Sequence, residues 1–259
     1  MTNARTVLIG DVHGHFGAWH ALLQSAGLVD QQGDWRGGNA TLVLLGDFFD
    51  RGSDGLRAVD AAMKLEGQAA SQGGRVWTVL GNHDVLTLAA RHFGTVPTTG
   101  PGGNFAEDWR LNGGEAGDLA GLTEAHVVWL STRPAMVRLG DDLVTHADAT
   151  FYARYGGSVD EVNAAFGALL RGRDAEAWDR LLDEFAERDT FLGEDGTQRL
   201  EDFLGQFGGT RLIHGHTPIA RVTRQEPAGV TAAFEYADGR AVNVDHGLYL
   251  GGPGFVFER

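Results

Sequence analysis

Five short stretches of this sequence combine glycine or threonine with residues that can carry chemistry. They are GDVHG at 10–14, GDFFDRG at 46–52, GNHD at 81–84, THA at 145–147 and HGHTP at 214–218. Each follows a short apolar run that is typical of a buried strand. Charged groups are rarely buried unless they are paired or bind a metal. The stretches therefore indicate either a functional site or turns held by ion pairs, such as one between Asp50 and Arg51.

The donor atoms in these stretches suit divalent metal ions. Asp11 and His13 are two residues apart, so in an extended chain their side chains point to the same side and can bind one ion. The sequence has no cysteine, which leaves nitrogen and oxygen ligands of the kind that suit manganese, iron or zinc. A single histidine would more often be an ordinary surface or core residue. Five strand ends together supply donors for two adjacent metals that share one carboxylate, an arrangement that makes a metal-bound hydroxide for phosphoryl transfer.

The elements that must position these residues are those of an α/β protein, because strand-like runs alternate with helical patterns. We expect strands over 6–9, 42–45, 76–80, 143–145 and 211–213, helices over 16–26, 53–70, 85–92, 158–170 and 176–187, and antiparallel strands within 230–257. Ligands of α/β sheets bind at the carboxyl ends of the strands. The five stretches are therefore expected to meet in one cleft.

Composition and length narrow the possible functions. The 259 residues carry a net charge of −14, which argues against general nucleic-acid binding. The N-terminal residues lack the features of a signal peptide, and no apolar run is long enough to span a bilayer, so we expect a cytoplasmic protein without membrane contact. We expect a single domain over 1–259, with an insertion at 94–125 and a helical segment at 150–205.

The ordered set of motifs resembles the calcineurin-like metallophosphoesterases. GDVHG, GDFFDRG and GNHD, followed by a lone histidine and a GH motif, are similar to the phosphoprotein phosphatase branch of that family, which includes small bacterial members and the symmetrical diadenosine tetraphosphatases. The match extends from Asp11 to His216, and the ordered set is far more specific than any one motif. The resemblance implies a sandwich of two mixed β-sheets flanked by helices, with the site at the strand ends between them.

The resemblance also implies a metal ligand set. Asp11 and His13 would bind the first metal, and Asp47 would bridge both metals. The second metal would be completed by Asn82, His146 and His216. Two divalent ions are implied, with Mn²⁺ expected first and Fe or Zn as alternatives.

Catalytic roles follow from the same resemblance. His83 would be the general acid that protonates the leaving oxygen, and Asp50 would hold its imidazole, since a carboxylate fixes the tautomer and raises the imidazole pKa. Arg51 would grip the phosphate with its planar fork, so Asp50 and Arg51 are expected to have different partners. The first candidate for a second phosphate-binding arginine is Arg188, followed by Arg173 or Arg199. The alternative for Arg188 is that it is a solvated charge at a helix end.

Two further histidines, His214 and His246, are expected near the site. His214 is either a hydrogen-bonded packing residue, which we favour, or a metal or supporting residue. His246 lies where the family has a turn that faces the active site, and could touch substrate or support a ligand.

Many metallophosphoesterases end GH-x-H, but Pro218 occupies the second histidine position here, as in the phosphatase branch. The first metal would then have only Asp11, His13, Asp47 and waters.

The expected function is that of a metal-dependent phosphatase that hydrolyses phosphomonoesters, either phosphoproteins or small molecules. The alternative is a symmetrical diadenosine tetraphosphate hydrolase or another nucleotide phosphoesterase, which would differ mainly in the pocket. A non-catalytic metal-binding scaffold on the same fold is a third hypothesis, which we rate low because every expected ligand and the expected acid are present.

Overall fold

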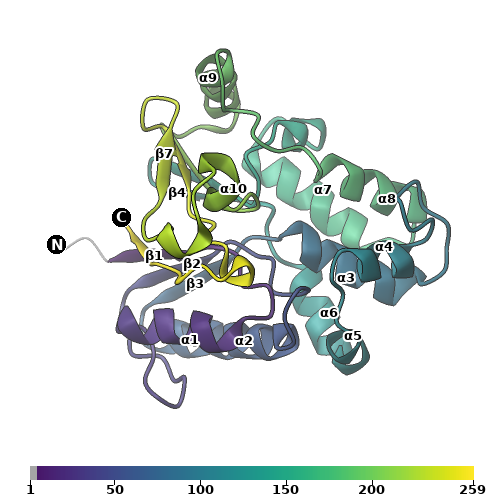
Figure 1. Ribbon diagram of the computed structural model, residues 1–259, viewed down its shortest axis with the longest axis horizontal. Coiled ribbons are helices and arrows are strands. Elements are labelled where there is room, and N and C mark those ends of the chain that lie inside the picture. Colours follow the sequence, from purple (N-terminus) through teal and green to yellow (C-terminus); the bar gives the residue numbers. More distant parts are fainter. Residues whose placement is uncertain (1–4) are drawn as a thin grey trace.

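The computed structural model describes residues 5–259 and contains two β-sheets with helices around them (Figure 1). The first sheet has the order β3 (Arg75–Thr78), β2 (Thr41–Leu44), β1 (Thr6–Ile9) and β9 (Phe257–Glu258). Strands β1, β2 and β3 are parallel, and β9 runs antiparallel to β1. The register pairs Ile9 with Leu44 and Leu44 with Thr78, so these three strands end at one edge of the sheet.

The second sheet has the order β4 (Met136–Leu139), β5 (Asp142–Thr145), β6 (Arg211–His214), β8 (Ala241–Asn243) and β7 (Phe234–Tyr236). The pairs β5–β6 and β6–β8 are parallel, whereas β4–β5 and β7–β8 are antiparallel. Both sheets are therefore mixed, as expected for this α/β fold.

Alternating apolar residues hold the two sheets face to face. In β1, Leu8 joins the core cluster between the sheets, which also contains Val43, Val144 and Ile213. Its neighbour Ile9 belongs to the larger core that packs against helices. Helices α1 (Phe16–Ser25) and α2 (Gly55–Ser71) run side by side along the outer face of the first sheet (Figure 1). This packing fixes the strand ends from which the polar stretches emerge.

The remaining helices lie mostly to one side of the sheets (Figure 1). They are α3 (Asn82–Phe93), α4 (Phe105–Leu111), α5 (Ala116–Gly121), α6 (Glu124–Ser131), α7 (Val159–Arg171), α8 (Ala175–Glu184), α9 (Gly196–Phe207) and α10 (Ile219–Thr223). Among residues 5–259, no helix is both long enough and apolar enough to cross a membrane.

The structure corrects the sequence-based elements in three places. Helix α3 begins at Asn82 rather than 85, so Asn82 and His83 lie in its first turn. Helix α6 is not among the expected elements, and α9 lies mostly within the helical segment expected at 150–205 but had no predicted bounds of its own. The expected antiparallel strands within 230–257 are only partly right, because β8 also pairs in parallel with β6, and β9 joins the first sheet.

Candidate active site

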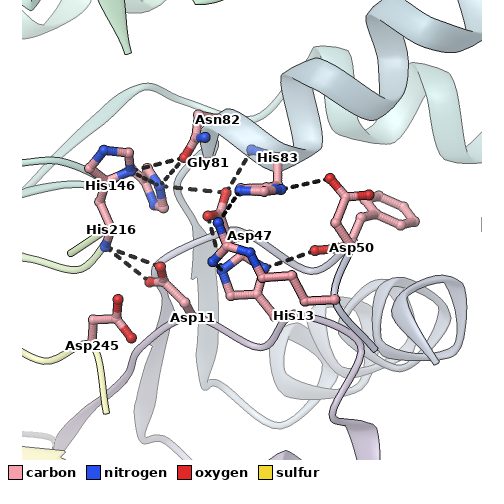
Figure 2. A network of polar contacts seen from close by, with 12 residues as sticks. Asp11, His13, Asp47, Asp50, Gly81, Asn82, His83, His146, His216 and Asp245 are labelled. Atoms are coloured by element: carbon pink, nitrogen blue, oxygen red, sulfur yellow. Dashed lines mark hydrogen bonds and ion pairs between the residues drawn. The ribbon is translucent and has the colours of Figure 1, made fainter. Parts of the chain in front are cut away.

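All five polar stretches meet where the strands of the two sheets end (Figure 2). Nine non-glycine residues within 5–259 have positive φ angles, and five of them belong to these stretches: His13 (45°), Asp47 (50°), Asp50 (68°), Arg51 (69°) and His216 (70°). Residues held in such sparsely populated conformations cluster at functional sites, because the surrounding structure must compensate for the strain. The backbone is therefore bent so that these side chains face one another.

Two glycines permit the close approach of neighbouring turns. A Cβ atom at Gly81 would lie 2.2 Å from Oδ1 of Asp47, and one at Gly215 would lie 2.3 Å from Oδ1 of Asp11. Any side chain at either position would collide with a candidate ligand. Glycine at these two points allows β3 and β6 to deliver their polar residues beside those of β1 and β2.

Asp47 lies at the centre of two groups of potential metal ligands. One group is His13, Asp47 and His83, the other is Asp47, His146 and His216, and in each the ligand atoms lie within 4.8 Å of one another. Oδ2 of Asp47 is 3.5 Å from Nε2 of His13, and Oδ1 is 3.5 Å from Nε2 of His146. One carboxylate thus presents a separate oxygen to each of the two groups.

The other expected ligands lie around these groups. Oδ1 of Asn82 is 3.0 Å from Nε2 of His146 and 2.9 Å from Nδ1 of His216. Asp11 accepts hydrogen bonds from the backbone N–H of His216, at 3.1 and 3.3 Å. The structure brings together all six residues expected to bind metal, although Asp11 is in neither of the two tight groups.

Backbone carbonyl groups orient two of the imidazoles. Nδ1 of His13 donates to the carbonyl oxygen of Phe49 at 2.9 Å, and Nδ1 of His146 donates to that of Leu45 at 2.7 Å. In both rings the Nε2 atom is left facing Asp47. Supporting contacts of this kind are usual for metal-binding histidines, because they fix the tautomer and the ring orientation.

His83 and Asp50 form a buried pair at one end of the site (Figure 2). Nδ1 of His83 lies 2.6 Å from Oδ2 of Asp50. Oδ1 of Asp50 accepts from Nε1 of Trp109 at 2.9 Å and from the Thr87 hydroxyl at 3.4 Å. Burial raises the pKa of Asp50, although the neighbouring His83 opposes this shift. Trp109 belongs to α4, and sequence reasoning had assigned it no role.

Arg51 reaches across the site from the other side of His83. Its two Nη groups donate to Nε2 of His13 at 2.8 Å and to Nε2 of His83 at 2.7 Å. The guanidinium also stacks on the Tyr249 ring, 4.2 Å from the ring centre. No ion pair joins Asp50 and Arg51 within 5–259. Asp50 and Arg51 do share one partner, because they contact opposite ring nitrogens of His83. The expectation that the two residues have different partners is therefore only half right.

The three candidate arginines lie in different places. Arg188 is exposed and lines a cavity of about 280 Å³ that also borders Asn82. Arg173 instead contacts Nδ1 of His92 at 2.7 Å, and Arg199 donates to the Thr190 carbonyl oxygen at 3.4 Å. Arg188 thus shares a cavity with Asn82, an expected metal ligand.

The two additional histidines do not contact the candidate ligands through hydrogen bonds. Nε2 of His214 lies 2.7 Å from the Tyr236 hydroxyl, and that hydroxyl donates its hydrogen to Asp148 at 2.9 Å, so His214 is a hydrogen-bonded packing residue. His246 packs edge-on against Phe255, and neither ring nitrogen has a hydrogen-bond partner within the described part of the chain. Burial lowers the pKa of His246 to about 4.

The charge balance of the site favours bound cations. Five carboxyl groups are buried around it, at most 1% exposed: Asp11, Asp47, Asp50, Asp84 and Asp245. Burial raises the pKa of Asp11, and the charge of Asp245 raises it further. Burial also opposes the charged forms of Asp47 and His146, but their mutual attraction prevails, holding the pKa of Asp47 low and raising that of His146 to about 10. Arg51 is the guanidinium that contacts the candidate histidines. The buried carboxylates bring more negative charge than one guanidinium balances, and this donor set therefore fits two divalent cations.

Comparison with known proteins identifies related sequences and structures. The profile of the calcineurin-like phosphoesterase family matches residues 4–220. The Shewanella-like protein phosphatase 2 of Arabidopsis thaliana is 36% identical over 84 residues, which are 32% of this chain and 22% of that protein. The Shewanella-like protein phosphatase 1 of Plasmodium berghei is 35% identical over 86 residues, 33% of this chain and 24% of that protein. The matched stretch thus spans less than a quarter of the length of these relatives.

Among solved structures, the cold-active protein-tyrosine phosphatase of a Shewanella species has a TM-score of 0.74 at 22% identity, and the match covers 98% of this chain and 75% of that one. A protein serine/threonine phosphatase from Saccharomyces cerevisiae has a TM-score of 0.61 at 14% identity, with 99% of this chain and 72% of that one covered. These similarities show a shared fold. The profile match over residues 4–220, most of the chain, shows that the chain belongs to the calcineurin-like phosphoesterase family.

Proposed function

We propose that this protein is a divalent-metal-dependent phosphatase that hydrolyses phosphomonoesters. The observation that carries the proposal is the placement of Asp47, which presents one oxygen to each of two ligand groups next to the buried His83–Asp50 pair. Two relatives are named as protein phosphatases, which supports the reaction class. The substrate is proposed to be a phosphorylated protein side chain or a small phosphate ester.

The metals are proposed to be bound by the six residues predicted from the sequence. Asp11 and His13 would hold the first ion, Asp47 would contact both, and the second would be completed by Asn82, His146 and His216. Mn²⁺ fits this mixture of imidazole, amide and carboxylate donors, and Fe or Zn are alternatives. When bound, such ions supply positive charge for the phosphoryl oxygens and an acidified water as nucleophile.

The protein's own side chains would position the phosphate and protonate the leaving group. The Arg51 fork can turn from the two imidazoles to two phosphate oxygens, because a guanidinium donates bidentately to such anions. Nε2 of His83 would then be free to carry a proton to the leaving oxygen, while Asp50 accepts from Nδ1 and stabilises the charged ring. His83 also belongs to the first ligand group, so a metal-binding role competes with the acid role and must be tested separately.

The cavity beside the site favours a compact substrate of low charge. Its rim includes Arg188 but also Asp108, Asp179 and Asp183. The Asp179 carboxylate accepts hydrogen bonds from the amide and the hydroxyl of Thr99, both at 2.9 Å, and so ties the loop of the 94–125 insertion to α8. We propose that this insertion forms part of the substrate pocket within a single domain over 1–259. Three carboxylates would disfavour a tetraphosphate, so a phosphomonoester is proposed ahead of diadenosine tetraphosphate.

A substrate panel with the manganese-loaded protein tests the proposal. We expect turnover of p-nitrophenyl phosphate and a phosphopeptide, and slower turnover of diadenosine tetraphosphate. Faster hydrolysis of the dinucleotide would replace this function with the nucleotide alternative. A protein that binds two metals but hydrolyses none of the three would favour the binding scaffold, and full turnover without metal would overturn the two-metal proposal.

A further inference from the structure

Asp245 carries a buried carboxylate oxygen that has no partner. It follows β8, and its side chain is fully buried. Oδ1 accepts from the backbone N–H of Gly247 at 2.9 Å, but Oδ2 has no hydrogen-bond partner within residues 5–259. Burying an unpaired carboxylate is costly, and buried charges are normally paired or coordinate a metal. The free oxygen therefore indicates a cation at this point.

The carboxylate of Asp245 is turned toward Asp11 (Figure 2). A Cβ atom at Gly10, directly before Asp11, would lie 2.2 Å from the Val244 carbonyl oxygen and 3.0 Å from Cα of Asp245. The turn after β8 thus packs against the turn that delivers Asp11. Within residues 5–259, the carboxylate of Asp11 has only the N–H of His216 as a hydrogen-bond donor. Asp11 and Asp245 are therefore neighbouring acidic side chains without a paired cation in the described chain.

The turn after β8 also lies next to position 218, where this chain has no histidine. The sequence has Pro218 where the GH-x-H motif would place a ligand for the first metal. The carbonyl oxygen of Asp245 accepts from the N–H of Ile219 at 3.0 Å, and a Cβ atom at Gly247 would lie 3.5 Å from Cβ of Pro218. Asp245 is therefore fixed beside the site of the missing imidazole.

We propose that Oδ2 of Asp245 is a direct ligand of the first metal and takes the place of the imidazole absent at position 218. The proposal rests on the proposed function, because it assumes that Asp11 and His13 hold a divalent ion. It gives the first metal four side-chain ligands, Asp11, His13, Asp47 and Asp245, to match the four of the second metal.

The proposal predicts opposite effects of Asp245→Asn on the metal-free and metal-loaded protein. Without metal, removing one of two adjacent buried charges relieves repulsion, so the melting temperature rises. With Mn²⁺, the loss of a ligand weakens one of the two binding events in calorimetry by at least about 10-fold, the lower limit reported for supporting residues. The increase in melting temperature caused by Mn²⁺ shrinks correspondingly.

Asp148→Asn is the matched control. Asp148 is equally buried, but both its oxygens have donors, the Tyr236 hydroxyl and the N–H of Asp189. This variant should keep both manganese affinities and gain no stability without metal. Asp245→Ala serves as a second variant: it should weaken the same manganese-binding event, but it should not gain stability without metal, because it also removes the acceptor of the Gly247 N–H.

The outcomes separate the inference from the proposed function. If the unaltered protein binds two Mn²⁺ ions and Asp245→Asn binds two with the same affinities, Asp245 is not a ligand, while the proposed function stands. If the unaltered protein binds no metal, the proposed function itself fails. Failure of both Asp245 variants to fold without metal would also overturn the inference, because the unpaired charge would then be stabilising.

Discussion

Nδ1 of His83 lies 2.6 Å from Oδ2 of Asp50, and both side chains are buried at 1% exposure. A buried carboxylate on one ring nitrogen fixes the orientation of the imidazole, and the opposite nitrogen, Nε2, faces the guanidinium of Arg51 at 2.7 Å. The geometry suits a general acid better than a freely rotating histidine.

Replacing His83 by Asn should lower kcat by about 10²- to 10⁴-fold while two metals remain bound. The loss should be largest for alkyl phosphates, whose leaving groups need the proton, and smallest for p-nitrophenyl phosphate. Steady-state kinetics across leaving groups, together with metal analysis, measure both effects. Unchanged turnover of an alkyl phosphate would show that His83 is not the acid, and loss of one metal would show that it is a ligand.

His126→Asn provides the matched control for this experiment. Nε2 of His126 lies 2.9 Å from Oδ1 of Asp60, so the chain contains a second histidine–aspartate pair outside the candidate site. This variant is expected to lose stability, because His126 also caps α6, and to keep the leaving-group dependence of the unaltered enzyme.

Trp109→Phe should lower kcat several-fold and leave KM nearly unchanged. The indole N–H donates to Oδ1 of Asp50 at 2.9 Å, and without it that oxygen keeps only the longer contact with Thr87. Losing a hydrogen bond to a buried charged group costs about 1–3 kcal/mol of stability. Kinetics and thermal denaturation together test whether the effect reaches the His83–Asp50 pair.

Trp129→Phe is the corresponding control, since its indole N–H donates to the half-exposed Glu66 at 2.7 Å. It removes the same type of bond from a tryptophan of α6. Similar losses of kcat in the two variants would mean that Trp109 acts only through global stability.

The strand ends that carry the candidate ligands could be predicted from the sequence, because each polar stretch follows a short apolar run, whereas the individual ligand roles came from the resemblance of the ordered motifs to a known family. Asp11 and Asp47 follow the parallel strands β1 and β2 of the first sheet, and His216 follows β6, which is parallel to β5 in the second sheet. Trp109 and Tyr249 could not be found in this way. Trp109 contacts Asp50 across 59 residues of sequence, and it lies in a glycine-rich stretch without a periodic pattern.

The fold was predictable where apolar periodicity is strong, and less so in the C-terminal part. Helix α9 lies mostly within the helical segment expected at 150–205, but its own bounds were not predicted, although Leu200, Phe203, Leu204 and Phe207 have helical spacing and are buried. The partner of β9 could not be inferred, because a strand of two residues carries no pattern, and its pairing with β1 depends on the path of the whole chain.

Arg51→Ala should lower kcat/KM by about 10²-fold or more, the usual effect of removing one preorganised donor to transition-state charge. Arg51→Lys should recover only part of this loss, because an ammonium group cannot donate bidentately or stack on Tyr249 as a guanidinium does. Kinetics with p-nitrophenyl phosphate measure both variants. Arg221→Ala, which removes a more distant guanidinium over the same ring at 5.9 Å, is the control. A fully active Arg51→Lys enzyme would contradict the bidentate grip.

Manganese should stabilise the protein against heat, and chelation should reverse the effect. Five buried carboxylates surround the site, and Asp11 and Asp245 have no paired cation within residues 5–259, so bound ions should compensate buried negative charge. A free metal concentration of 100 times Kd adds about 2.7 kcal/mol for each site. Scanning calorimetry with and without a chelator measures this shift. Asp47→Asn should abolish most of it, since Asp47 is the residue common to both ligand groups, and an equal shift in that variant would contradict the bridging role.

Neutralising the acidic rim should improve the use of highly charged substrates. The double variant Asp179→Asn, Asp183→Asn removes two negative charges beside the cavity while retaining oxygens that can accept from Thr99. We expect KM for diadenosine tetraphosphate to fall by about 2- to 10-fold at low ionic strength, with a smaller change for p-nitrophenyl phosphate. Salt should reduce the difference, because the charges are near the surface. Asp195→Asn, Asp202→Asn changes the net charge equally at α9, away from the cavity, and an equal gain there would show that total charge, rather than the rim, controls substrate choice.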